Sequence, residues 1–265
     1  MKHLGWISLV IIVAAACAPT PAPTPTLAPA TQPVPPTQVP PTATAALAPA
    51  VLAGPQAGSS MRWIDGSELL YVPSGDFIIG NDQGSTPQKT VYLDAFWIYA
   101  SPVTNRMYTQ CVATGNCAPP AQEIGSPVYS NPLYGDFPVV GVTWDMAANY
   151  CGWAQAQLPT EAQWEKAARG EDGAVYPWGI AAPSCNTLNF KGCVGHSTSV
   201  LDFPDGRSPY GVYDMAGNVF QWVNDFYDEH AYDAMADRNP TGPAAGSSHV
   251  LRGSSYETEK SILAS

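Results

Sequence analysis

One segment of the chain limits what the rest of it can fold into. Residues 18–50 read APTPAPTPTLAPATQPVPPTQVPPTATAALAPA and contain neither a charged nor an aromatic side chain. This composition buries too little apolar surface to offset the entropy of ordering, and its prolines favour an extended polyproline II conformation. We therefore expect a disordered Pro/Thr-rich stalk over residues 17–60. Residues 61–265 remain for a single folded domain, which is long enough for one sizeable core.

The residues before the stalk have the pattern of an export signal. A short basic start, Met1-Lys2-His3, precedes an apolar run over residues 4–16 that is too short to span a bilayer. Ala14-Ala15-Ala16 before Cys17 resembles the bacterial lipobox, although Ala14 stands where leucine is usual. We expect a signal peptide over residues 1–16 and a lipid on Cys17 that anchors the protein on the extracytoplasmic face of the membrane. Cleavage without lipidation, which would give a secreted protein, is the alternative.

The charge of the chain excludes one class of partner. Lys and Arg number 11 against 22 Asp and Glu, a net charge of −11. Nucleic acids and anionic membrane surfaces require the opposite, a basic patch. We therefore expect no nucleic-acid partner, and contact with a membrane only through the lipid anchor.

The cysteines are consistent with an oxidising compartment. The chain has six of them, Cys17, Cys111, Cys117, Cys151, Cys185 and Cys193. Positions 111 and 117, and positions 185 and 193, are close neighbours separated by glycine-containing loops, so we expect these two disulfides. With Cys17 assigned to the lipid, Cys151 in the apolar segment 144–154 would remain a buried free thiol. The histidines are scattered and no Cys-x-x-Cys pair occurs, which disfavours zinc.

Regular secondary structure is expected to be sparse. Short apolar runs predict strands at residues 69–72, 77–80, 91–99 and 250–252. Thr104, Thr143 and Thr160 stand where N-caps are expected, and predict helices over residues 105–113, 144–154 and 161–169. Thr160 followed by Gln163 is a capping box, and Gly170 ends the third helix. Few helices, short strands and long loops indicate an α+β domain.

Seven motifs occur in a defined order along this domain. They are PSGDFIIG (73–80), PVTN (102–105), PVVGVTW (138–144), LPTEAQWE (158–165), YPWG (176–179), YGVYDMAGNV (210–219) and LRGSSY (251–256). Together they resemble the formylglycine-generating enzyme, or sulfatase-modifying factor, family over about residues 68–256. The resemblance implies a compact fold of the C-type-lectin-like kind, low in regular structure and often stabilised by calcium. Family members continue with an Arg-rich stretch and a closing strand, so we expect the domain to be incomplete at its C-terminus.

The resemblance does not extend to the copper site of the family. Enzymes that generate formylglycine hold Cu(I) with two cysteines after this last motif, because a soft monovalent ion requires soft thiolate ligands. Here Thr258 and Leu263 stand at those positions. We therefore expect no catalytic residues and no copper. Ser255 matches the pocket serine of the family, but its simpler interpretation is a turn hydroxyl, and Phe220 replaces a tryptophan of the oxygen-binding pocket.

The resemblance matches the calcium ligands of the family better than its copper ligands. One site would use the Asp214 side chain, the carbonyls of Gly217 and Val219, and Gln221 in place of the family's glutamate. Oxygen ligands from a tight loop suit Ca²⁺, but a neutral amide weakens the site. Asn189 matches one ligand of a second site whose acidic ligand is missing.

Two functions from different classes remain open. The first is a surface-displayed, non-catalytic binding module for an unknown glycan or protein ligand, because binding residues concentrate on loops held by a scaffold. Tyr227 and Tyr232 are candidates for stacking on sugars, with core packing as the alternative. The second is an oxidoreductase of the formylglycine-generating type acting on a sulfatase cysteine, or a related non-heme metal oxidase. A decayed gene product is a third possibility.

Overall fold

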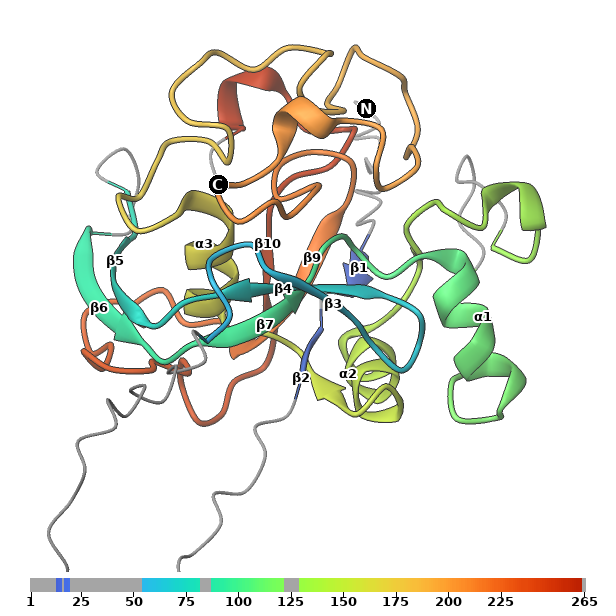
Figure 1. Ribbon diagram of the computed structural model, residues 1–265, viewed down its shortest axis with the longest axis horizontal. Helices are drawn as coiled ribbons and strands as arrows, with labels where there is room; N and C mark the ends of the chain where they lie inside the picture. Colours follow the sequence, from blue (N-terminus) through green and yellow to red (C-terminus); the bar gives the residue numbers. More distant parts are fainter. Residues whose placement is uncertain (1–12, 16, 20–53, 82–86, 122–128, 264–265) are drawn as a thin grey trace, which may run out of the picture. The chain divides into compact units, whose positions relative to one another are not determined.

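Short strands in four small sheets, together with three α-helices, form the regular structure of the residues that the computed structural model describes (Figure 1). These residues are 13–15, 17–19, 54–81, 87–121 and 129–263. The expected stalk and most of the expected signal peptide lie outside them. Among the described residues, no helix combines the length and apolar character needed to cross a bilayer. The mixture of few helices and small sheets confirms the predicted α+β class.

Two antiparallel sheets follow one another along the first part of the domain. In one, β4 (Glu68–Val72) lies between β3 (Ser60–Arg62) and β7 (Phe96–Tyr99). In the other, β5 (Gly75–Ile79) pairs with β6 (Lys89–Leu93). The two strands that flank the turn at Pro73 therefore belong to different sheets.

The remaining two sheets join segments that are far apart in the sequence. The central strand of one is β9 (Phe220–Phe226), which pairs parallel with β1 (Val13–Ala15) and antiparallel with β10 (His249–Arg252). The other joins β2 (Ala18–Pro19) to β8 (Ala156–Gln157). Residues at the start of the chain are thus built into both sheets.

The prediction of one strand over residues 91–99 is wrong. The segment divides into β6 and β7 because Asp94 and Ala95 are both exposed, which breaks the alternation of buried and exposed positions. Residues that are distant in the sequence stabilise this break. Asp94 accepts hydrogen bonds from Arg238 and Asn239, and its backbone N–H donates to the Asn239 side chain at 2.8 Å.

The three helices begin where their caps predict. They are α1 (Asn105–Ala113), α2 (Trp144–Trp153) and α3 (Glu161–Arg169). The hydroxyls of Thr104, Thr143 and Thr160 each accept from a backbone N–H in the first turn. The capping box is complete, since the Gln163 side chain accepts from the Thr160 N–H at 2.9 Å. Three short 3₁₀ turns also occur in the described residues, η1 (Pro132–Tyr134), η2 (Pro204–Gly206) and η3 (Lys260–Ile262).

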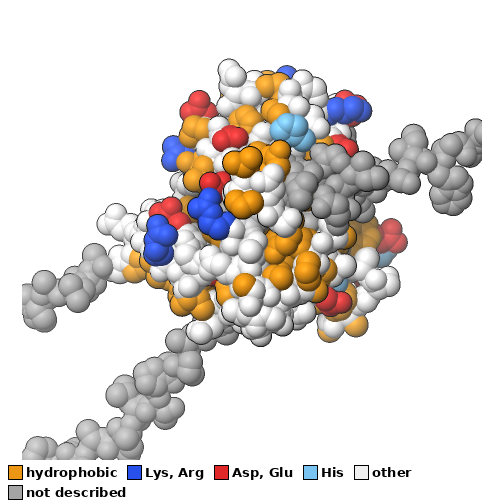
Figure 2. All heavy atoms as spheres, turned by 90° about the vertical axis from the view of Figure 1, so that its right-hand side faces the viewer, with side chains coloured by type: hydrophobic (Ala, Val, Ile, Leu, Met, Phe, Trp, Pro, Cys, Tyr) orange, Lys and Arg blue, Asp and Glu red, His pale blue; other side chains and the backbone are white. Residues whose placement is uncertain are grey.

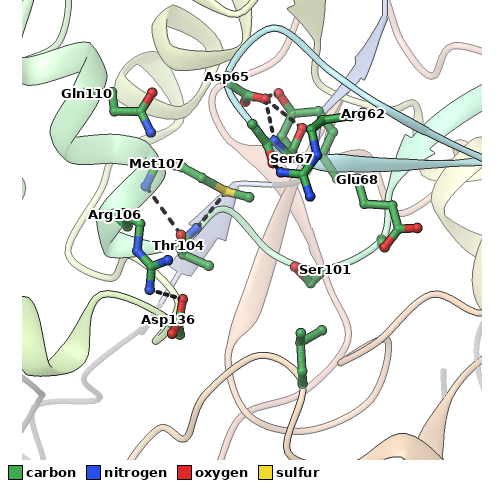
Figure 3. A pocket seen from close by; sticks show the side chains of 14 residues that line it. Arg62, Asp65, Ser67, Glu68, Ser101, Thr104, Arg106, Met107, Gln110 and Asp136 are labelled. Atoms are coloured by element: carbon green, nitrogen blue, oxygen red, sulfur yellow. Dashed lines mark hydrogen bonds and ion pairs between the residues drawn. The ribbon is translucent and has the colours of Figure 1, made fainter.

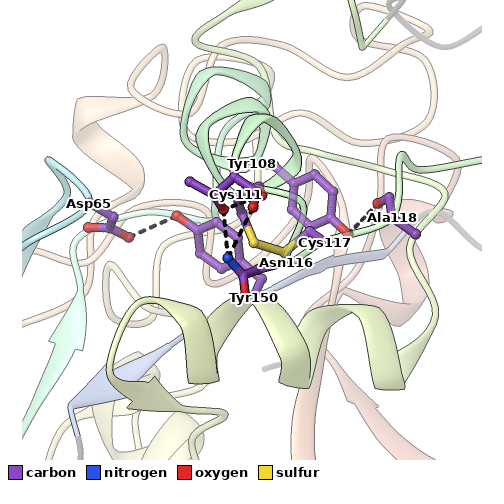
Figure 4. The surroundings of a disulfide bond; sticks show 8 residues. Asp65, Tyr108, Cys111, Asn116, Cys117, Ala118 and Tyr150 are labelled. Carbon is purple, nitrogen blue, oxygen red and sulfur yellow. Dashed lines mark hydrogen bonds between the residues drawn. A yellow bond between two sulfur atoms is a disulfide. The ribbon is translucent and has the colours of Figure 1, made fainter.

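Two large apolar clusters hold these elements together. The first packs α3 against β5, β6 and β9 and includes Phe77, Leu93 and Trp164. The second surrounds α1 and α2 and includes Tyr108 and Tyr150, whose rings stack with their centroids 5.5 Å apart. The disulfide between Cys111 and Cys117 joins the end of α1 to the following loop beside these two tyrosines (Figure 4).

Both disulfides predicted from local spacing are present, Cys111–Cys117 and Cys185–Cys193. The prediction of a free thiol at Cys151 is wrong, because the structure pairs Cys151 with Cys17 across 134 residues. The described residues contain no free cysteine. A lipid on Cys17 would require the same sulfur atom, so the lipid and this disulfide are mutually exclusive.

Candidate functional site

The loop after β10 holds the positions at which the resemblance places the copper ligands. Ser255 and Thr258 bond to one another across a tight turn. The Ser255 N–H donates to the Thr258 hydroxyl at 2.9 Å, and the Thr258 N–H donates to the Ser255 carbonyl at 2.9 Å. The Ser255 hydroxyl accepts from the Glu257 N–H at 3.2 Å, so Ser255 has the turn-forming role that its simpler interpretation predicted.

The second of these positions lies in the apolar interior. Leu263 is 3% exposed and packs with Leu188, Phe190 and Ala216 in a small cluster. The two loops are also joined through the backbone, where the Lys191 N–H donates to the Thr258 carbonyl at 3.0 Å. One position therefore closes a turn and the other fills a core, and neither side chain carries a soft ligand atom.

The loop expected to bind calcium is organised by hydrogen bonds of its own. Gln221 is buried, and its side-chain oxygen accepts from the Trp164 indole N–H at 3.0 Å. Its amide nitrogen donates to the Asp214 backbone carbonyl at 2.6 Å. Because the indole is only a donor, it fixes which end of the amide faces it, and the nitrogen faces the loop. Gln221 therefore does not fit the role of a calcium ligand.

The other predicted ligands lie close together in this loop. The Asp214 carboxylate accepts from the Asn218 amide at 2.9 Å, and burial raises the pKa of the Asp214 carboxyl to about 8. The Asn189 carbonyl accepts from the Asn218 N–H at 2.8 Å, which brings Asn189 to the same loop. The Asn189 side-chain oxygen is buried with no hydrogen-bond partner among the described residues, which suits a cation ligand. The described part of the chain nevertheless holds no cluster of three or more His, Cys, Asp or Glu side chains suited to a metal.

The motif LPTEAQWE at the start of α3 ends in Glu165, which lies at the centre of a buried network of ion pairs and hydrogen bonds. Glu165 accepts hydrogen bonds from Arg169, from the Gly80 N–H at 2.7 Å and from Arg252 at 2.6 Å. Burial alone would lower the pKa of Arg252, but the carboxylates of Glu165 and Glu161 outweigh burial and raise it. The network ties β10 and the end of β5 to α3, and its role is structural.

A pocket of about 370 Å³ opens on another part of the domain, between the β3–β4 turn and the start of α1 (Figure 3). It is lined by Arg62, Asp65, Gly66, Ser67, Glu68, Tyr99, Ala100, Ser101, Thr104, Arg106, Met107, Gln110, Asp136 and Leu201. We call it the α1 pocket. Arg62 donates to the Gly66 carbonyl at 3.0 Å, and Arg106 pairs with Asp136. The rim of the pocket thus carries both signs of charge.

The floor of the α1 pocket is rigid. The buried Asp65 carboxylate accepts from the hydroxyls of Tyr99, Tyr150 at 2.8 Å and Ser67 at 2.6 Å, and from the Ser67 N–H at 3.0 Å. Burial, together with nearby charge, raises the pKa of both tyrosines well above the usual value, so both remain donors. Figure 4 shows that Tyr150 links this floor to the Cys111–Cys117 disulfide. Sequence reasoning missed the pocket because its lining comes from separate segments with no shared motif.

The two tyrosines proposed for sugar stacking lie in different environments. Tyr227 is 60% exposed. Tyr232 packs against the first apolar cluster, and its hydroxyl lies 3.4 Å from the Glu161 carboxylate, so core packing accounts for it. Of the two, only Tyr227 is available to a ligand.

Comparison with known proteins identifies the class to which this fold and loop arrangement belong. The family model described as "Sulfatase-modifying factor enzyme 1-like domain" matches residues 57–265. The chain belongs to this family. It is 31% identical over 273 residues to a formylglycine-generating enzyme of Streptomyces coelicolor, a match that covers 81% of this chain and 86% of that protein.

Other similar proteins have different names and architectures. The chain is 33% identical over 216 residues to the serine/threonine-protein kinase pkn1 of Chlamydia pneumoniae, a match covering 74% of this chain and 34% of the kinase. It thus spans about a third of the length of the chlamydial kinases it matches. Among solved structures, PvdO from Pseudomonas aeruginosa superposes with a TM-score of 0.66 at 23% identity, covering 78% of this chain and 89% of that one. This structural similarity to PvdO confirms that the chain has the fold predicted from its motifs.

Proposed function

We propose that the protein is a non-catalytic binding module that acts outside the cytoplasm. The observation that carries this proposal is the state of the two positions after β10. Thr258 closes a turn and Leu263 fills a core, so the domain keeps the family fold while these residues serve its structure. Function in such folds depends on the site, and the site here lacks the thiolates that the copper chemistry requires.

Three disulfides support a location outside the reducing cytoplasm. We propose export through residues 1–16, with the Pro/Thr-rich stalk separating the domain from its point of attachment. Whether attachment occurs through a lipid on Cys17 is decided by the intact mass of the exported protein. A mass increased by acyl groups supports the anchor, whereas an unmodified, disulfide-bonded Cys17 supports the secreted alternative.

The α1 pocket is the binding site that we propose. Its rigid floor and its rim of two guanidinium groups, carboxylates and hydroxyls suit a polar ligand with many hydroxyls, and we favour a glycan over a protein ligand. Figure 2 shows the side of the domain that lies on the right in Figure 1, on which Lys and Arg side chains lie at separate points without forming a basic patch. Tyr227 offers an exposed ring elsewhere on the surface.

A glycan array tests this proposal with two variants. Arg106→Ala alters the rim of the pocket, and we expect it to abolish binding of any glycan that the native protein retains. Arg238→Ala is the matched control, because Arg238 forms a similarly exposed ion pair, with Asp94, away from the pocket. Equal loss in both variants, or no retained glycan at all, would contradict a glycan site in the α1 pocket.

An oxidoreductase is the second candidate, favoured by the 31% identity to a formylglycine-generating enzyme. It requires a copper or iron site built from residues outside the two family positions. Conversion of a sulfatase-derived cysteine peptide by the purified protein would establish this activity and overturn the binding proposal.

For calcium, we propose a weak structural site that uses Asp214 and the carbonyls of Gly217 and Val219 without Gln221. The buried, unpartnered Asn189 oxygen supports a second weak site. Calorimetric titration with calcium of protein dialysed against a chelator tests both sites.

A further inference from the structure

The loop between β9 and β10 contains a further pocket, of about 430 Å³, which shares no lining residue with the α1 pocket. All of the residues that line it come from the segment 228–243. We call it the β9–β10 pocket. Figure 1 shows this loop folded back beside β6. Its volume lies in the range of sites that bind small molecules.

The loop is fixed to β6 by backbone hydrogen bonds. The Tyr92 N–H donates to the Asp237 carbonyl, and the Asn239 N–H donates to the Tyr92 carbonyl, both at 2.8 Å. Met235 packs against the first apolar cluster, and its carbonyl accepts from the Lys89 ammonium group at 2.5 Å. Because β6 is already paired here, the pocket is a feature of the folded loop and not an open sheet edge.

The polar groups of the β9–β10 pocket favour a cation. The Asp228 carboxylate lines it, and none of the described residues that do so is a lysine or an arginine. This carboxylate accepts a hydrogen bond from the His230 N–H at 2.8 Å and forms no ion pair within the described part of the chain. The His230 imidazole also lines the pocket, and it lies 3.3 Å from the Asp233 carboxylate and 3.6 Å from the Glu229 carboxylate. The charged groups around the pocket are therefore acidic.

The basic side chains that approach this loop are bound elsewhere. Lys89 pairs with Asp237 at 2.9 Å. Arg238 pairs with Asp94, and its guanidinium carbon lies 4.0 Å from the centre of the Tyr92 ring. Neither basic side chain lines the pocket, so the carboxylate there keeps an unmatched negative charge.

The walls of the β9–β10 pocket are mostly aliphatic. Three alanines, two prolines and the thioether of Met235 line it. Such walls suit a hydrocarbon body, whereas the carboxylate suits a positive charge. The net charge of −11 also attracts cations to the protein and repels anions.

We propose that the β9–β10 pocket binds a small organic cation that consists of an ammonium group on an aliphatic body. The ammonium group pairs with Asp228, and the aliphatic body lies against the alanine, proline and methionine side chains. This site is separate from the α1 pocket and from the loop proposed for calcium, and the inference does not depend on either.

Three probes with the same aliphatic body test the role of charge. They are hexylammonium, hexanol and hexanoate, which carry a positive charge, no charge and a negative charge. Their affinities are measured by NMR titration of the full chain, observed on the probe. An exposed ion pair contributes up to about fivefold in affinity, so we expect hexylammonium to bind about three- to fivefold more tightly than hexanol. We expect hexanoate to bind more weakly than either.

Two pairs of variants test the location of the site. Asp228→Asn removes the charge but keeps an acceptor for the His230 N–H, and should lower the affinity for hexylammonium to about that for hexanol. Asp205→Asn, in η2, removes the same charge from an exposed position outside the pocket and should change nothing. Ala234→Arg adds bulk and positive charge to the exposed lining and should abolish binding, whereas Ala182→Arg, at another exposed alanine, should not.

Three results would overturn the inference. The first is that hexylammonium does not bind, or binds no better than hexanol, which would show that the pocket does not select a cation. The second is an equal loss of affinity in Asp228→Asn and Asp205→Asn, which would show that only the overall charge attracts the probe. The third is an equal effect of Ala234→Arg and Ala182→Arg, which would place binding outside this pocket.

Discussion

Replacing Leu263 with alanine tests whether this position belongs to the core. Leu263 is 3% exposed and contacts a small cluster that includes Leu188 and Phe190. Truncating a buried leucine costs about 2–5 kcal/mol, depending on how far the cavity collapses. The cluster is small, and partly buried residues such as Tyr176 and Trp178 pack against it. We therefore expect the lower half of the range, about 2–3 kcal/mol.

The assay for Leu263→Ala is thermal and urea unfolding of the purified domain with its disulfides intact. For a domain of this size, 1 kcal/mol corresponds to about 2–4 °C, so we expect Tm to fall by roughly 4–12 °C. Leu133→Ala is the matched control, because Leu133 is 84% exposed and its truncation should change stability by less than about 0.5 kcal/mol. Equal Tm values for the two variants would refute the reasoning and leave position 263 free for another role.

Three further predictions concern the buried polar groups. Glu165→Ala removes the carboxylate that binds the buried Arg169 and the half-buried Arg252, and should cost about 3–5 kcal/mol in urea unfolding, whereas Glu259→Ala, which removes an exposed pair, should cost less than about 1 kcal/mol. Similar costs for both would show that the network is dispensable. Burial raises the pKa of Asp225 to about 7, so the folded state holds this proton more tightly than the unfolded state. The stabilisation is complete below the usual pKa of about 4 and is lost as the pH rises through 7. We expect the free energy of unfolding to decrease between pH 5 and pH 8, and Asp225→Asn to flatten this profile; an unchanged slope in the variant would exclude Asp225 as its source. Gln221→Glu places a second carboxylate oxygen where the amide nitrogen now lies, so millimolar calcium should raise the Tm of this variant by several degrees more than that of the native protein. Equal shifts would show that position 221 does not face a cation site.

Local features of the fold were predictable because they depend on neighbours in the sequence. Thr104, Thr143 and Thr160 cap helices through hydrogen bonds that span three residues, and the capping box with Gln163 is equally local. The disulfides at positions 111/117 and 185/193 close short loops, so their spacing was enough to pair them.

Features that depend on distant contacts were not predictable in the same way. The Cys17–Cys151 disulfide joins residues 134 apart, and nothing near either cysteine indicates its partner. The break at Asp94 depends on Arg238 and Asn239, which approach from the far end of the domain.

For the candidate sites, too, residue type was predictive, whereas features that depend on distant contacts were not. The sequence indicated that Thr258 and Leu263 could not bind copper, because residue type alone decides that question. It did not indicate that one closes a turn and the other fills a core. The α1 pocket requires the β3–β4 turn, β7 and α1 to meet, and only the fold brings them together.

The central claim is that this family member does not perform the copper chemistry of formylglycine generation. The most direct measurement combines Cu(I) titration of the purified protein, in competition with a chelator, with mass spectrometry of a sulfatase-derived cysteine peptide incubated with the same protein and oxygen. We predict that the protein retains no Cu(I) against the chelator and that the peptide cysteine is unchanged. Stoichiometric Cu(I) binding together with conversion of that cysteine to formylglycine would contradict the account.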